Sequence, residues 1–242
     1  MKTIILGPPG TGKTTTLLNL VDEFIQQGIR PKQIGYFSFT KKAATEAANR
    51  AAIKFELDAE NDLENFRTLH SYAFKMLGMT KEKMMSASDY KEFGQKCGIP
   101  IKTAKFSTED GTFNSDNEYL TIINTARVRQ MDLLEYYDSR QNILDIERGT
   151  LYLISEELKR YKSEKRLKDF TDLLQDFLDQ QIKSKFEVLF IDEAQDLSLL
   201  QWKMVKQIWQ NVDKTYIAGD DDQAIFKWAG ADVDHFIALK SE

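Results

Sequence analysis

Residues 7–14 have the types and spacing of a phosphate-binding loop. They read Gly-Pro-Pro-Gly-Thr-Gly-Lys-Thr and match the pattern G-x-x-x-x-G-K-[ST] directly after a short apolar run. Glycines let backbone N–H groups point at phosphate oxygens, where Lys13 would neutralise the β- and γ-phosphates and Thr14 would ligate Mg²⁺. The alternative is an ordinary strand-to-helix turn. The pattern predicts nucleotide contacts from Gly7, Pro8, Pro9, Gly10, Thr11, Gly12, Lys13, Thr14 and Thr15.

An acidic pair, Asp192 and Glu193, follows a second apolar run at residues 188–191. A magnesium nucleotide site needs a carboxylate at the end of a neighbouring strand, where Asp192 would hold the metal through water. Glu193 would orient and deprotonate the water that attacks the γ-phosphate. A solvated turn or the start of a helix can also carry such a pair, but the loop in the same chain favours the metal site.

Strand-like and helix-like segments alternate at both ends of the chain. Short apolar or β-branched runs are separated by stretches with helical periodicity. The predicted strands are 4–6, 34–39, 188–191 and 215–218, and the predicted helical segments are 14–27, 41–78 and 197–209. This alternation predicts an α/β fold, a parallel sheet with helices on both faces.

The middle of the chain has a different character. Residues 80–166 lack a strong buried-strand run and carry more charge, and the Gly- and Ser-containing stretch 105–116 is predicted to be a surface loop between helices. We therefore predict a mainly helical inserted subdomain at 80–166, within a core formed by residues 1–79 and 167–242. Residues 156–168 hold six basic and three acidic side chains. They form either a solvated helix face, which is favoured, or a surface for nucleic acid.

Composition excludes several classes of protein. The 242 residues are 42% hydrophobic and 29% charged, which is typical of a folded domain, and the net charge of −5 argues against a protein that coats duplex nucleic acid. A single cysteine, Cys97, excludes an internal disulfide, and it has no zinc-like spacing with His70 and His235. Neither a secretory signal nor an apolar run of about 18 to 20 residues is found. We expect a protein of the cytoplasm without a membrane partner.

Five segments of the chain have the character of sequence motifs. They are residues 192–196, Asp-Glu-Ala-Gln-Asp, residues 219–223, Gly-Asp-Asp-Asp-Gln, and the segments Tyr36–Arg50, Arg67–Phe74 and Asp169–Leu174. Together they resemble one family, the superfamily 1 DNA helicases of the UvrD, Rep and PcrA type. Tyr36–Arg50 resembles that family's motif Ia, Arg67–Phe74 resembles the segment after it, and Asp169–Leu174 resembles a stretch that precedes the acidic strand. The resemblance implies a RecA-like P-loop core with a helical insertion in the place of the family's 1B subdomain.

The resemblance also implies roles for individual residues. Gln195 and Gln223 would contact the attacking water or the γ-phosphate, since an amide donates and accepts at once. Thr40 and His70 would meet a DNA strand, and Trp228 would stack on a base, an interaction worth roughly 1 to 3 kcal/mol. A structural histidine is the alternative for His70, and core packing is the alternative for Trp228.

The chain departs from the family pattern at three places. Ala229 stands where an arginine is usual, no upstream glutamine motif is seen, and the sequence given stops before a second RecA-like domain with its γ-phosphate-binding arginines. The resemblance therefore implies the N-terminal half of a 3′→5′ ATP-dependent DNA helicase of repair or replication. It would use ATP, Mg²⁺ and single-stranded DNA, with the second domain in the same or a partner chain.

Two alternatives to this prediction stay open. One is a nucleotide-dependent module that binds single-stranded DNA without helicase activity, and the other is a free-standing P-loop phosphotransferase. By itself, the 242-residue chain is expected to hydrolyse ATP weakly and not to separate strands.

Overall fold

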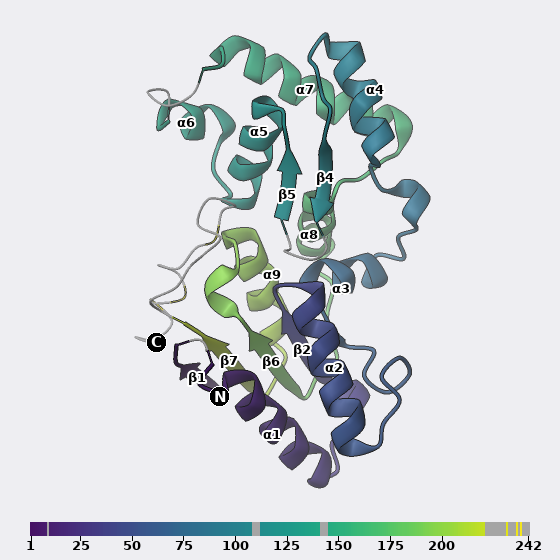
Figure 1. The fold of residues 1–242 in the computed structure, drawn as a ribbon, viewed down its shortest axis with the longest axis vertical. Helices are drawn as coiled ribbons and strands as arrows, with labels where there is room; N and C mark the ends of the chain where they lie inside the picture. Colours follow the sequence, from purple (N-terminus) through teal and green to yellow (C-terminus); the bar gives the residue numbers. More distant parts are fainter. Residues whose placement is uncertain are drawn as a thin grey trace.

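The computed structural model describes residues 1–8, 10–107, 112–140, 145–220, 231, 236 and 238. Its centre is a five-stranded sheet in which every pairing is parallel, with the order β1-β7-β6-β2-β3 (Figure 1). The strands are β1 (Lys2–Leu6), β2 (Ile34–Ser38), β3 (Phe66–Arg67), β6 (Val188–Asp192) and β7 (Lys214–Gly219). The predicted α/β class with a parallel sheet is confirmed. β7 lies between β1, which leads into the loop at residues 7–14, and β6, which ends at Asp192. These two strands are therefore not direct neighbours in the sheet.

Helices cover both faces of this sheet, and alternate residues of each strand pack against them. The helices are α1 (Lys13–Gln26), α2 (Lys41–Phe55), α3 (Leu69–Met76), α8 (Phe170–Asp179) and α9 (Leu199–Trp209). Tyr36 and Phe190 belong to a core shared with α1 and α2, whereas the next residues, Phe37 and Ile191, belong to a core shared with α3, α8 and α9. This alternation follows from the two-residue period of a strand. We call the sheet with these helices the sheet lobe.

The buried face of α2 explains how this helix approaches the sheet. Ala44, Ala47, Ala48 and Ala51 are all buried, and their small side chains allow close packing. Thr40 begins the helix, because its hydroxyl accepts a hydrogen bond from the Ala43 N–H at 3.1 Å. Within the stretch expected to be helical throughout, residues 41–78, the structure instead contains the short strand β3. That expectation was wrong because two residues are too few to produce a strand pattern, and their pairing with β2 decides their conformation.

Residues between α3 and α8 form a second part of the molecule, which we call the insertion lobe (Figure 1). It comprises α4 (Ala87–Cys97), β4 (Ala104–Ser107), β5 (Thr112–Ser115), α5 (Glu118–Val128), α6 (Leu133–Asp138) and α7 (Arg148–Lys165). The lobe has its own apolar core, in which Phe93, Leu151 and Tyr161 are almost fully buried. None of the helices in the described ranges has the length and apolar character needed to cross a bilayer.

The insertion lobe contains a β-hairpin where a surface loop was expected. β4 and β5 pair antiparallel, with Phe106 opposite Phe113. The expectation for residues 105–116 was wrong because the Gly and Ser content hid a short alternation of apolar and polar residues. Phe106 is half-buried and reaches toward the sheet lobe, where it stacks on Phe170 with ring centroids 4.2 Å apart.

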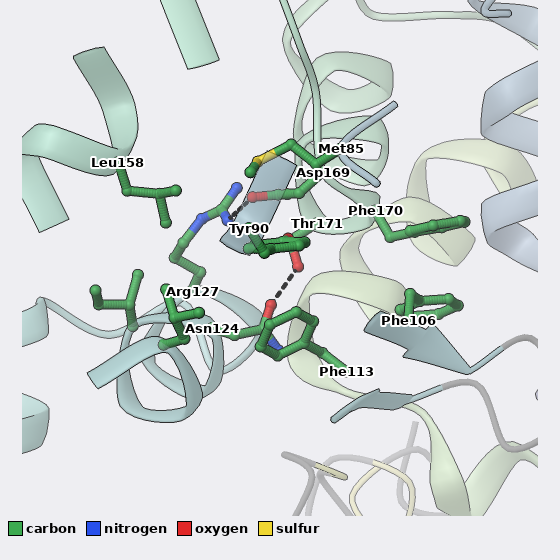
Figure 2. Close-up of a pocket in the computed structure, with 12 residues that line it drawn as sticks. Met85, Tyr90, Phe106, Phe113, Asn124, Arg127, Leu158, Asp169, Phe170 and Thr171 are labelled. Carbon is green, nitrogen blue, oxygen red and sulfur yellow. Dashed lines mark hydrogen bonds and ion pairs between the residues drawn. The ribbon is translucent and has the colours of Figure 1, made fainter. Parts of the chain in front are cut away.

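A buried ionic cluster joins the two lobes. Asp169, which begins α8, accepts hydrogen bonds from Arg127 of α5 at 2.7 Å (Figure 2) and from Lys162 of α7 at 2.6 Å. Both cations also bond Asp172. Burial alone would raise the pKa of Asp169, but Arg127 and Lys162 together hold that pKa well below its usual range. The cluster therefore remains charged at neutral pH and fixes α8 against two helices of the insertion lobe.

Candidate nucleotide site and adjoining groove

The loop between β1 and α1 needs glycine at several positions. Gly10 and Gly12 have φ angles of 79° and 82°, a left-handed conformation that favours glycine. A Cβ at Gly7 would lie 2.6 Å from Oγ1 of Thr11, whose hydroxyl donates to the Pro8 carbonyl at 2.7 Å. The sequence therefore folds into a tight loop that leads directly into the N-terminus of α1, with Thr15 exposed in the first turn.

Lys13 lies with its ammonium group over this loop. Its Nζ donates hydrogen bonds to the carbonyl oxygens of Gly7 at 2.6 Å and Pro8 at 3.2 Å, and the side chain is buried. The loop carbonyls thus hold the lysine in the position from which it would meet a phosphate. A phosphate oxygen that approaches would exchange these two neutral acceptors for a charged one, which makes a stronger hydrogen bond.

Thr14 and Asp192 meet although they come from opposite ends of the chain. The Thr14 hydroxyl donates to Oδ2 of Asp192 at 2.8 Å, and the backbone N–H of Glu193 donates to Oδ1 at 3.0 Å. Asp192 is only 2% exposed, and burial raises the pKa of its carboxyl. A hydroxyl and a carboxylate are the hard oxygen ligands that Mg²⁺ prefers, so these two residues fit the metal that the loop pattern implies. The Thr14 proton points at Asp192, which leaves the hydroxyl lone pairs free for a metal.

The Asp192 carboxylate has a third partner that the sequence did not reveal. The hydroxyl of Tyr36, on β2, donates to the same Oδ2 atom at 2.8 Å. Tyr36 lies within the motif-Ia-like segment, but nothing in that segment distinguishes a tyrosine that packs in the core from one that bonds a carboxylate. The contact depends on the pairing of β2 with β6.

Glu193 diverges from Asp192 and contacts a different set of groups. Its φ of 54° turns the chain at the end of β6, and its Oε2 accepts a hydrogen bond from Nε2 of Gln195 at 2.7 Å. Oε1 of Gln195 in turn accepts from the backbone N–H of Asp220, just after β7, at 3.0 Å. Gln195 therefore connects the acidic pair to the end of the strand that carries the Gly219–Asp220 motif. Four residues named in the sequence analysis lie outside the described residues: Pro9, Gln223, Trp228 and Ala229. The roles predicted for them therefore stay predictions.

A groove of about 580 Å³ lies between α2, α3 and the insertion lobe. Its wall is largely apolar and aromatic, with cationic side chains from Lys41, Arg67 and Lys81, and its described lining includes no carboxylate. The described lining residues are Phe39, Lys41, Ala44, Thr45, Phe66, Arg67, Thr68, His70, Ser71, Phe74, Lys81, Met84, Phe106 and Phe170. Such a surface suits a ligand that has flat rings and negative charge.

Thr40 and His70, the two predicted DNA contacts in the described chain, are placed differently. The Thr40 hydroxyl caps α2, and only its neighbours Phe39 and Lys41 line the groove. His70 lines the groove but is 7% exposed, with its ring centroid 4.6 Å from that of Phe106. Burial lowers the pKa of His70 to about 4, against the opposing effect of Asp169, so the ring is neutral at pH 7.

Aromatic residues of the groove were largely missed by sequence reasoning. Phe39 and Phe170 lie inside the segments that carry the family resemblance, and this position is a signal from which they could have been predicted. Phe106 gave no such signal, since it lies in the stretch expected to be a loop. Figure 2 shows Phe106 and Phe170 side by side near the junction of the lobes.

The sheet order, the phosphate-binding loop and the acidic strand together define a RecA-like α/β domain. The profile of the UvrD/REP helicase N-terminal domain matches residues 1–242, and the chain belongs to this family. Similar proteins include the ATP-dependent DNA helicase Rep of Buchnera aphidicola subsp. Baizongia pistaciae (strain Bp), which is 26% identical over 99% of this chain and 36% of its own length.

Two further relatives have the same relation to the chain. A probable DNA helicase II homolog of Mycoplasma pneumoniae is 26% identical over 99% of this chain and 35% of its own length. The ATP-dependent DNA helicase PcrA of Leuconostoc citreum is 25% identical over 99% of this chain and 33% of its own length. The chain thus spans about a third of the length of these relatives.

Proposed function

We propose that the chain is the ATP-binding and single-stranded-DNA-binding N-terminal part of an ATP-dependent DNA helicase or translocase that moves 3′→5′. The observation that carries the proposal is the hydrogen bond between Thr14 and Asp192, which joins the phosphate-binding loop to the acidic strand. The family and the printed names of the relatives support the same function. Direction of movement rests on the family resemblance.

Each residue of the nucleotide site then has a distinct task. Lys13 binds the β- and γ-phosphates, while Thr14 and Asp192 hold Mg²⁺, which when bound neutralises phosphate charge. Glu193 accepts a proton from the attacking water and is held in place by Gln195. Because Gln195 also contacts the Asp220 backbone, a shift of Glu193 on hydrolysis is passed to the end of β7. Gln223 would sense the same γ-phosphate.

The groove is the proposed path of the DNA strand. Lys41, Arg67 and Lys81 supply positive charge for phosphates, while Phe39, Phe106 and Phe170 supply rings near which bases can stack. The net charge of −5 is compatible with this, because the charge that matters lies in the groove. Trp228 would stack on a base, as the family resemblance implies. We assign residues 1–79 and 167–242 to the core domain and residues 80–166 to the inserted subdomain.

Hydrolysis at a useful rate and strand separation are proposed to need a second RecA-like domain. An arginine that neutralises charge on the γ-phosphate contributes about 10³ to 10⁵ in rate, and the family supplies it from that domain. We therefore expect a polypeptide of residues 1–242 to bind ATP, turn it over slowly and leave duplexes intact. The second domain, added in cis or as a separate chain, should raise DNA-stimulated turnover by orders of magnitude, and Glu193→Gln should remove that gain.

The nucleotide site is tested by Lys13→Ala. The variant loses the charge that meets the phosphates but keeps the fold, since Lys13 bonds only carbonyl groups of the loop among the described contacts. Calorimetry with Mg²⁺ and a nonhydrolysable ATP analogue should show binding to the wild-type chain and none to the variant. Lys159→Ala, on the exposed surface of α7, is the matched control. Equal affinities in all three proteins would remove the loop from the proposal.

The DNA path is tested by the salt dependence of oligonucleotide binding. Lys41→Ala and Lys81→Ala each remove one exposed cation from the groove, so each should reduce the slope of log K against log salt by about 0.7. Lys159→Ala should leave the slope unchanged. A slope that no groove lysine alters would place the strand elsewhere. ATP turnover that single-stranded DNA does not stimulate, with the second domain present, would favour a phosphotransferase.

A further inference from the structure

Tyr36 carries a polar group into the interior of the sheet lobe. The side chain is fully buried on β2, and its ring stacks on Phe66 with centroids 5.0 Å apart and planes 6° apart, and on Phe190 at 6.1 Å. These contacts fix the plane and the direction of the ring. A buried hydroxyl needs a hydrogen-bond partner, because an unsatisfied one is costly. A phenylalanine would make the same ring contacts without that requirement.

The partner of this hydroxyl is the carboxylate of the nucleotide site. Tyr36 pairs with Phe190 across β2 and β6, and its hydroxyl extends along the sheet to Asp192, two residues further on. Oδ2 of Asp192 thereby accepts from Tyr36 and from Thr14, each at 2.8 Å, while Oδ1 accepts from the Glu193 N–H at 3.0 Å. Three donors from three segments of the chain thus fix the rotation of one carboxylate.

We propose that Tyr36 is a positioning residue for magnesium: its hydroxyl holds the Asp192 carboxylate so that Asp192 keeps the Thr14 hydroxyl turned toward the metal. The inference rests on the proposed nucleotide site. The order of contacts is Tyr36 to Asp192 to Thr14, and only the last two would touch the metal or its water. Partners that orient metal ligands in this way typically change metal affinity 10- to 100-fold when they are removed.

Tyr36→Phe removes only the hydroxyl group, since the ring and its stacking contacts with Phe66 and Phe190 are kept. Tyr216→Phe is the matched control, because Tyr216 is buried on β7 in the same apolar core and stacks on Phe190 at 5.2 Å. Nucleotide binding is titrated with Mg²⁺ by the fluorescence of a labelled ADP. We expect the Mg²⁺ concentration for half-maximal binding to rise about tenfold in Tyr36→Phe and to stay unchanged in Tyr216→Phe. Affinity in EDTA should be equal in all three proteins.

A second measurement covers the case in which Tyr36→Phe melts at a lower temperature. The readout is the increase in melting temperature that ADP produces with Mg²⁺, minus the increase that ADP produces in EDTA. Each increase is measured against the same protein without ADP, so the starting melting temperature is subtracted. The difference should shrink in Tyr36→Phe alone. The inference would be overturned if Tyr36→Phe needed the same Mg²⁺ concentration for half-maximal binding as the wild type and showed the same Mg²⁺-dependent increase in melting temperature. It would also be overturned if Tyr216→Phe lost as much Mg²⁺ affinity as Tyr36→Phe. If the wild-type chain bound the nucleotide equally well with Mg²⁺ and in EDTA, the proposed function would be overturned instead.

Discussion

His70→Phe should remove a loss of stability that the wild-type protein suffers in mild acid. Burial of the ring beside the stacked rings of Phe106 and Phe170 lowers the pKa of His70 from its ordinary value of 6.5 to about 4. The unfolded chain therefore takes up a proton as the pH falls below 6.5, while the folded chain does not. The contribution of His70 to the free energy of unfolding is therefore fully present above pH 6.5 and is lost as the pH falls toward 4.

The size of the effect follows from the two pKa values. Each pH unit between them contributes up to about 1.4 kcal/mol, so the wild-type protein should lose about 2 kcal/mol between pH 7.5 and pH 5 through this residue. Phenylalanine does not titrate and retains the aromatic contacts. The cluster around Asp169 does not mask the result, since the pKa of Asp169 is held well below this range in the folded protein and both proteins contain it.

Urea unfolding followed by circular dichroism at pH 7.5, 6 and 5 measures the difference. The free energy of unfolding should fall more steeply with acid in the wild type than in His70→Phe, and the gap should be about 2 kcal/mol at pH 5 relative to pH 7.5. Parallel curves would show that the ring is protonated as easily in the folded protein as in the unfolded one. His70 would then be solvated, and a charged contact with a DNA phosphate would become possible for it.

Two further substitutions test other parts of the structure. Asp169→Asn should destabilise the protein by roughly 3 to 5 kcal/mol in urea unfolding at pH 7, because Arg127 and Lys162 would keep their charges and lose a buried partner; a loss below 1 kcal/mol would show that the cluster is well solvated. Gly219→Ala should cost roughly 1 to 3 kcal/mol, since the added Cβ would lie 2.6 Å from the ring of Phe236 and 2.9 Å from Oε1 of Gln195. With the second domain present, it should also slow DNA-stimulated ATP turnover. Normal stability and turnover would mean that the end of β7 tolerates displacement of Phe236 and Gln195.

Local patterns were sufficient to predict the α/β class and to select the residues of the candidate nucleotide site. The loop at 7–14 could be recognised from its own residues, whereas the acidic pair after 188–191 was interpreted as a metal site because the loop occurs in the same chain. The meeting of Thr14 with Asp192 could be expected as well, because parallel strands end at one edge of the sheet. Which strand separates them is a property of the sheet order and needed the structure.

The remaining features depend on contacts between distant segments. Phe66 and Arg67 form a strand only because β2 offers a free edge, and the β4–β5 hairpin is stabilised by aromatic packing that no short window of sequence displays. Phe106 reaches the groove from one lobe while Phe170 reaches it from the other. Tyr36 looks like ordinary core filling until β2 is paired with β6. Hydrophobic pattern therefore predicts the elements, but tertiary pairing decides which side chains meet.

The sheet order also determines when the candidate nucleotide site can form during synthesis. β1 pairs with β7 from Lys2–Thr215 through Leu6–Gly219, so a strand made among the first residues waits for one made near residue 219. At about 5 to 20 residues per second on the ribosome, that wait lasts on the order of tens of seconds. During this time the insertion lobe, whose contacts are closer in sequence, can already fold. The loop at residues 7–14 is then among the last parts to assemble, because β1 has no partner until β7 is made. A chain that stalled before β7 would leave the apolar segment Ile4 to Leu6 without its partner strand.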